Sequence, residues 1–169
     1  MRYGSDKVSR RNLCCTLLLV TACECAMAAR SWEFQVFLDN EAIGYHRYTL
    51  LEKGAQRELA IEARFTVKFL FFKAYSYAHE ATERWRHDCL DGIEARTIDG
   101  GKRTAVSATE DGGRLAISSP RGRETFDGCV MSFAYWNPEI LRQSHLLNAQ
   151  TGEYTAIQVA ELGEEEIMV

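Results

Sequence analysis

The sequence predicts a mainly β protein: a single antiparallel meander sheet curled into an unclosed barrel, with a short helical plug near residues 130–145. Three observations support this fold class. Apolar and polar residues alternate through much of residues 32–119, turn residues recur at short intervals, and the period changes once, after Cys129. Short strands joined by regularly spaced tight turns are typical of an antiparallel meander rather than of βαβ units.

The first 29 residues have the pattern of a signal peptide. A basic start precedes the apolar run Leu13–Cys23, which is shorter than the roughly 20 residues that cross a bilayer. Ala26, Met27 and Ala28 then supply the small residues that signal peptidase needs. We therefore exclude residues 1–29 from the fold as a signal peptide and expect residues 30–169 to form one exported domain, periplasmic or secreted.

Two other leader types compete with ordinary cleavage after Ala28, which we favour. Val20–Cys23 resembles a weak lipobox, which would leave Cys23 lipidated and the protein anchored in the envelope. Ser9–Leu13 resembles a twin-arginine signal. Contact with a membrane is expected only if Cys23 is lipidated.

Removal of the leader leaves two of the six cysteines, Cys89 and Cys129. An even pair in an oxidising compartment favours a disulfide between them. The alternative is a reactive thiol at Cys89 with His87 as its base, because residues 87 and 89 of one strand share a face.

The clearest strands lie between residues 32 and 69. Trp32, Phe34, Val36 and Leu38 share one face of a first strand, and a turn at Asn40-Glu41 leads to a second strand, Ile43–Leu51. The strongest alternation runs from Leu59 to Phe69, with six apolar positions in a row at period two. It predicts a half-buried strand, long enough to cross a wide and twisted sheet.

Residues 70–88 fit either a helical stripe or a strand. We prefer a strand, because no capping residue opens a helix and aromatic residues suit a pleated surface. Turns at Leu90–Gly92, Asp99–Gly101 and Asp111–Gly113 then separate predicted strands near 93–98, 102–110 and 114–119.

A helix start is predicted at residues 137–139. Asn137 is the N-cap, Pro138 has a φ suited to the first helical turn, and Glu139 places an acidic side chain at the positive end of the helix. Tyr135 and Trp136 stand directly before it, where apolar residues tend to pack on the core. We expect both to cover one mouth of the sheet and to be more than half buried. If Trp136 is a core residue, its replacement by alanine should cost about 3–5 kcal/mol.

Four motifs carry a resemblance to a known family: E-R-W at 83–85, T-I-D-G at 97–100, F-A-Y-W-N-P at 133–138 and L-L-N-A-Q-T-G-E at 146–153. The chain resembles the exported proteobacterial proteins of unknown function termed DUF6134, which lie close to DUF3108-like periplasmic domains. The resemblance covers most of residues 32–169. It implies a fold of the lipoprotein-carrier type, an unclosed barrel around an apolar cavity, and such a likeness fixes no function.

The resemblance also implies that relatives continue beyond the strand matching Tyr154–Leu162 with a further hairpin, so that the domain here is truncated. That strand would lack a neighbour and expose backbone groups. We expect a partly open barrel with a frayed C-terminus, or self-association through the edge, which the acidic run Glu164–Glu166 would discourage.

His79, Glu83 and His87 are the sharpest candidates for a metal or catalytic site. On a helix they would share one stripe, as a zinc site requires. On a strand successive members lie about 13 Å apart, beyond the reach of one ion. We therefore expect no metal and no cofactor, with Glu83 facing inward and paired to an arginine or to backbone N–H groups.

The sequence itself predicts no reaction, and it contains no nucleophile elbow. We expect a non-enzymatic exported β-sheet protein that binds a lipid or other amphipathic molecule, with Tyr135, Trp136, Glu83 and His79 as ligand-binding candidates. One alternative is a small envelope enzyme acting on a lipid-like substrate through Glu83, His79 or Tyr135. Another is a structural envelope protein with a filled core. The net charge of −4 argues against a nucleic-acid partner.

Overall fold

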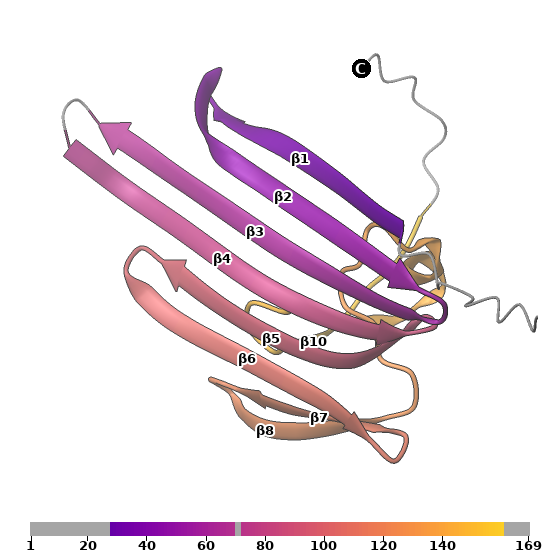
Figure 1. The fold of residues 1–169 in the computed structure, drawn as a ribbon. Helices are drawn as coiled ribbons and strands as arrows, with labels where there is room; N and C mark the ends of the chain where they lie inside the picture. The colour runs from indigo at the N-terminus through magenta and orange to yellow at the C-terminus, as the bar shows by residue number, and fades with distance from the viewer. Residues whose placement is uncertain (1–27, 70–71, 161–169) are drawn as a thin grey trace, which may run out of the picture.

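The computed structural model describes residues 28–69 and 72–160, and their main feature is one eight-stranded antiparallel sheet (Figure 1). Every strand pairs with its sequence neighbour, so β1 and β8 form the two edges and the described sheet does not close. The strands are β1 (Ala28–Leu38), β2 (Glu41–Lys53), β3 (Gln56–Phe69), β4 (Phe72–Arg86), β5 (Cys89–Asp99), β6 (Lys102–Asp111), β7 (Arg114–Ser119) and β8 (Gly122–Asp127). The predicted fold class, an unclosed antiparallel meander, is confirmed.

Residues 128–160, which we call the covering segment, return across one face of this sheet (Figure 1). They contain the 3-10 helix η1 (Pro138–Arg142) and two short strands, β9 (His145–Leu147) and β10 (Tyr154–Ala156), which pair with each other. The core lies between the two layers, where buried Trp85, Ile93 and Leu115 of the sheet share one cluster with Met131 and Leu147 of the covering segment.

The helix start predicted at Asn137 is confirmed, although the element is a single 3-10 turn rather than a longer plug. The Asn137 side-chain oxygen accepts a hydrogen bond of 3.0 Å from the Glu139 backbone N–H. Pro138 begins the helix, where its fixed φ is already suitable. No helix within residues 28–69 and 72–160 is long and apolar enough to cross a membrane.

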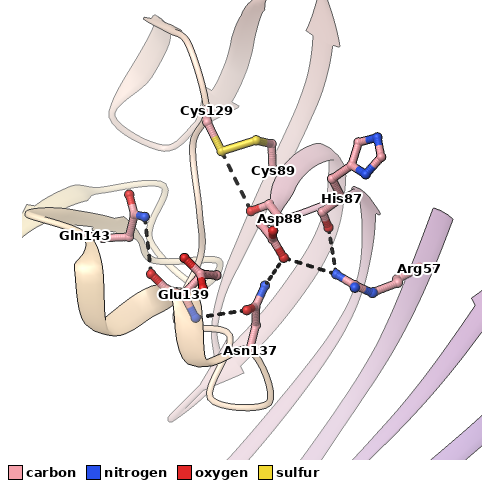
Figure 2. The surroundings of a disulfide bond; sticks show 8 residues. All are labelled: Arg57, His87, Asp88, Cys89, Cys129, Asn137, Glu139 and Gln143. Carbon is pink, nitrogen blue, oxygen red and sulfur yellow. Dashed lines mark hydrogen bonds and ion pairs between the residues drawn. A yellow bond between two sulfur atoms is a disulfide. The ribbon is translucent and has the colours of Figure 1, made fainter. Parts of the chain in front are cut away.

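Cys89 and Cys129 form the predicted disulfide, which joins the start of β5 to the start of the covering segment (Figure 2). The Cys129 sulfur lies 3.8 Å from the backbone carbonyl oxygen of Asp88. The alternative of a reactive thiol at Cys89 is wrong for this structure, because the thiol is consumed in the bridge. His87 lies in the exposed turn before β5, at φ 56°, instead of continuing a strand.

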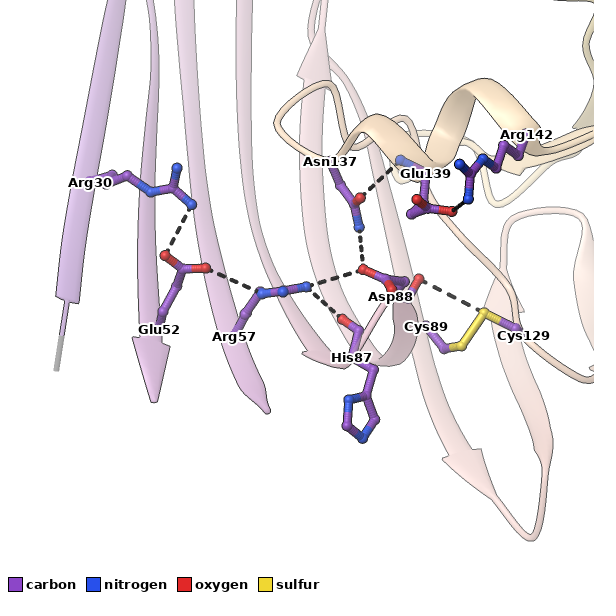
Figure 3. A network of polar contacts seen from close by, with 10 residues as sticks. All are labelled: Arg30, Glu52, Arg57, His87, Asp88, Cys89, Cys129, Asn137, Glu139 and Arg142. Atoms are coloured by element: carbon purple, nitrogen blue, oxygen red, sulfur yellow. Dashed lines mark hydrogen bonds and ion pairs between the residues drawn. A yellow bond between two sulfur atoms is a disulfide. The ribbon is translucent and has the colours of Figure 1, made fainter. Parts of the chain in front are cut away.

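A chain of polar contacts beside the disulfide also fastens the covering segment to the sheet (Figure 3). Asn137 donates to the Asp88 carboxylate at 3.1 Å, and Arg57 donates to the same oxygen at 3.3 Å. Arg57 also donates to the His87 carbonyl at 2.8 Å and lies 3.3 Å from the Glu52 carboxylate. The contacts continue to Arg30 on β1, so this end of the sheet is joined from its edge strand to η1.

The turn predicted at Leu90–Gly92 is wrong. The chain reverses at His87–Asp88, and residues 90–92 belong to β5, where Asp91 is the extra residue of a bulge opposite Arg84 and Trp85. A Cβ atom on Gly92 would lie 2.4 Å from the Arg84 guanidinium. Glycine at this position leaves room for the Arg84 side chain, which a larger residue would displace. Close approach of a neighbouring strand is one reason for a glycine within a strand.

The predicted strand at Tyr154–Leu162 is also wrong in extent and in its partner. β10 ends at Ala156 and pairs with β9, so it has a neighbour and does not extend the main sheet. The run Glu164–Glu166 and residues 1–27 of the predicted leader lie outside the described residues. β1 begins at Ala28, so it includes the last two residues of that predicted leader.

Candidate ligand-binding groove

A groove lies between the covering segment and the half of the sheet formed by β1 to β4. Its larger part has a volume of about 490 Å³ and its smaller part about 240 Å³. The two parts share His46, Tyr48, Phe133 and Tyr135, so we treat them as one groove. The larger part is further lined by Trp32, Phe34, Val36, Leu59 and Trp136, and the smaller by Ile61, His79, Glu83, Ser132 and Asn148–Gln150.

The sheet forms the floor of the groove through its register. His46 of β2 pairs with Ala63 of β3, and Ala63 pairs with His79 of β4, so the three side chains form one row across the sheet. The row continues to Phe34 on β1 and to Thr97 on β5. The small side chain of Ala63 lies between the two imidazoles. The row therefore places the polar side chains of His46, His79 and Thr97 on the sheet face that forms the floor of the groove.

The covering segment forms the wall, and its two predicted aromatic residues lie differently in it. Trp136 is partly buried and packs edge-on against Trp85, with ring centroids 5.4 Å apart. Tyr135 is 75% exposed at the rim, so the prediction that it is more than half buried is wrong. The reason is the local backbone: Ala134 and Asn137 are turned into the structure, and Tyr135 between them points outward.

Replacing Trp136 with alanine is expected to lower the free energy of unfolding by about 2 kcal/mol. The ring is only partly buried, so the loss should be smaller than for a full core residue. It also stacks under the Arg57 guanidinium, whose central carbon lies 5.4 Å from the ring centroid. Denaturant unfolding would measure the change, with Leu141→Ala on the exposed side of η1 as the control. If the variant kept its stability but lost ligand binding, Trp136 would contribute to the binding site and not to the stability of the core.

Glu83 lies at the base of the smaller part of the groove and is only 2% exposed. Ser132 Oγ donates to its Oε2 at 2.9 Å, and Trp85 Nε1 donates to the same oxygen at 3.2 Å. The arginine or backbone N–H partner that we predicted is therefore replaced by a hydroxyl and an indole. Burial raises the pKa of Glu83 to about 7, and the two hydrogen bonds only partly oppose this rise.

His79 is 4% exposed and its Nδ1 lies 2.8 Å from the Thr97 hydroxyl. Burial, together with the nearby His46, lowers the pKa of His79 to about 4. His79 is therefore neutral near pH 7. Burial also lowers the pKa of His46, whose Nδ1 lies 3.2 Å from the Tyr48 hydroxyl and whose buried Nε2 has no partner among the described residues.

All four predicted site residues thus line the groove, but His87 does not join His79 and Glu83, because it lies in the exposed turn after β4. No group of three or more metal-ligating side chains occurs in the described ranges. Sequence reasoning missed His46 and Tyr48. The sequence shows only that both residues occupy alternate positions of one strand. The pairing of β2 with β3 is what brings them near His79.

The motifs that carry the family resemblance also meet at this groove. Glu83 of the first motif is its buried acid, and Thr97 of the second holds His79. The third motif supplies the wall at 133–136, and the fourth supplies residues 148–150 at the polar end. Motifs far apart in the sequence are thus brought together around one cavity.

The fold and the groove define an open antiparallel meander whose own C-terminal segment covers one face and leaves a lined cleft. The chain belongs to the family described as domain of unknown function DUF6134, which it matches over residues 34–169. Comparisons with curated proteins and with solved structures gave no match.

Proposed function

We propose that the protein is an exported, non-enzymatic module that binds a lipid or other amphipathic molecule in the groove. The observation that supports this most is the division of the groove into a larger aromatic and aliphatic part and a smaller part that contains most of its polar side chains. Small-molecule sites are mostly apolar clefts of this size with a few polar groups that orient the ligand. Export is supported by the leader pattern of residues 1–29.

The groove would hold the apolar portion of the ligand against Trp32, Phe34 and Leu59, and its polar portion near Glu83 and His79. A structural protein with a filled core, our other non-enzymatic alternative, has no need of such a cleft. Native mass spectrometry of freshly purified protein tests the proposal, since a carrier should retain a co-purified amphipathic molecule and a filled sheet should not.

A small envelope enzyme acting on a lipid-like substrate is the second candidate function, and Glu83 favours it. A buried carboxyl group with a pKa of about 7 suits general acid–base catalysis. The two functions differ in the fate of the ligand. A binding module releases it chemically unchanged, whereas an enzyme releases a product and loses turnover in a Glu83→Gln variant.

Tyr135→Ala is expected to weaken binding of the neutral fluorescent probe N-phenyl-1-naphthylamine by about fivefold to tenfold. The reason is that the variant lacks the exposed aromatic ring at the rim of the groove. The matched control is Tyr75→Ala, since Tyr75 is also exposed, at 39%, but does not line the groove. Fluorescence titration measures both. Equal losses in the two variants would contradict this role of Tyr135, and no saturable binding to the wild type would contradict the proposed function.

A further inference from the structure

The groove contains one acidic side chain and no basic one to balance it. Among its lining residues there is no lysine or arginine, and its two histidines, His79 buried and His46 half-buried, have lowered pKa values. Arg57, which stacks on the wall residue Trp136, is already engaged by the carboxylates of Asp88 and Glu52. The charge of Glu83 therefore has no counterpart within the described part of the chain.

We infer that the ligand is an amphipathic amine, whose cationic head group pairs with Glu83 while its alkyl or aromatic portion occupies the larger part of the groove. This inference rests on the proposed function, because it takes the groove to be the ligand site. It adds the chemical class of the ligand.

The hydrogen bonding of Glu83 leaves room for such a partner. Both donors, Ser132 and Trp85, bond to Oε2, and Oε1 has no partner among the described residues. A buried carboxylate without a cation is costly, and an ammonium group bound beside it would supply both the opposite charge and N–H donors.

The rest of the lining agrees with a cation and disfavours an anion. The faces of Tyr48 and Tyr135 can interact with an ammonium group, and Asn148 and Gln150 contribute polar groups at the same end. A carboxylate or phosphate head group would instead be buried near Glu83 with no positive side chain in the lining to compensate. The groove is thus matched to amines rather than to fatty acids.

Three ligands with the same chain and different head groups test the inference: dodecylamine, dodecanol and dodecanoate. Each is titrated at pH 8 against the purified chain by displacement of N-phenyl-1-naphthylamine. We expect dodecylamine to bind about tenfold or more tightly than dodecanol, and dodecanoate to bind more weakly than dodecanol.

Glu83→Gln should remove the advantage of dodecylamine and leave dodecanol within about twofold of the wild-type value. The control Glu94→Gln loses the same charge on the exposed side of β5 and should keep that advantage. If Glu83→Gln does not fold, Glu83→Asp, which retains the carboxylate, should keep the order of the three ligands.

Dodecanoate or dodecanol binding as tightly as dodecylamine would overturn the inference and leave the proposed function standing. An amine preference that survives in a folded Glu83→Gln variant would also overturn it. If none of the three ligands displaces the probe and no amphipathic molecule co-purifies, the proposed function fails and the inference fails with it.

Discussion

Replacing Cys89 and Cys129 with serine is expected to lower the free energy of unfolding by about 4 kcal/mol. The bridge closes a loop between residues 40 apart in sequence, and its loss restores conformational freedom to the unfolded chain. The loop contains β5 to β8, so the disulfide links the covering segment to the sheet across four strands. Urea unfolding of the oxidised wild type and the double serine variant measures the difference.

The reduced wild type is the control for the serine substitutions. It should unfold at the same urea concentration as the variant, because both lack the bridge and differ only in sulfur against oxygen. Equal stability of the oxidised wild type and the variant would show that the polar contacts of Arg57, Asp88 and Asn137 hold the covering segment without covalent help.

Relative to a Glu83→Gln variant, the wild type is expected to lose about 3 kcal/mol of stability between pH 4.5 and pH 8. Burial raises the pKa of Glu83 from 4.5 to about 7, so the folded state holds the proton more tightly than the unfolded state. The stabilising contribution is therefore fully present below pH 4.5 and is lost as the pH rises through 7. Glutamine does not titrate, and its contribution stays constant.

His79 shifts stability with pH in the opposite sense. Its pKa is lowered to about 4, so its contribution is present above pH 6.5 and is lost as the pH falls toward 4. Because His79 is present in both proteins, its effect cancels in their difference. Urea unfolding of the two proteins at pH 4.5, 6 and 8 gives that difference, and a value that does not change with pH would contradict a buried, unpaired Glu83.

The sheet was predictable from sequence because its determinants are local. Alternation along Leu59–Phe69 and the glycine-containing turns at Asp99–Gly101 and Asp111–Gly113 each act within a few residues. The disulfide followed from counting cysteines. Gly92 misled the interpretation because a glycine can mark either a turn or a close approach, and only the position of Arg84 distinguishes them.

The groove was predictable only in part, since it depends on contacts between distant residues. Glu83 was expected on the inward face from the period of its strand, and it lies there. Its partner Trp85 lies two positions along the same strand and shares that face, whereas its partner Ser132 could not be predicted, because residue 132 belongs to an irregular segment with no period. For the same reason nothing in the sequence indicated that Tyr135 would point outward while Trp136 packs inward.

The order of the chain determines when the groove can be completed as the chain emerges from the ribosome or, when it is exported unfolded, from the membrane. Every ladder of the main sheet joins sequence neighbours, so the sheet can form hairpin by hairpin as the chain emerges from its N-terminus. The groove instead needs contacts between residues about 50 positions apart, such as Glu83 with Ser132 and Asp88 with Asn137, each separated by 49 residues. Residues 128–160 are made after all eight strands, and until they emerge the apolar face holding Trp85 and Ile93 has no cover. An emerging chain thus carries an exposed face of the kind that chaperones recognise, and its cleft becomes available to a ligand only once the covering segment has emerged and folded onto the sheet.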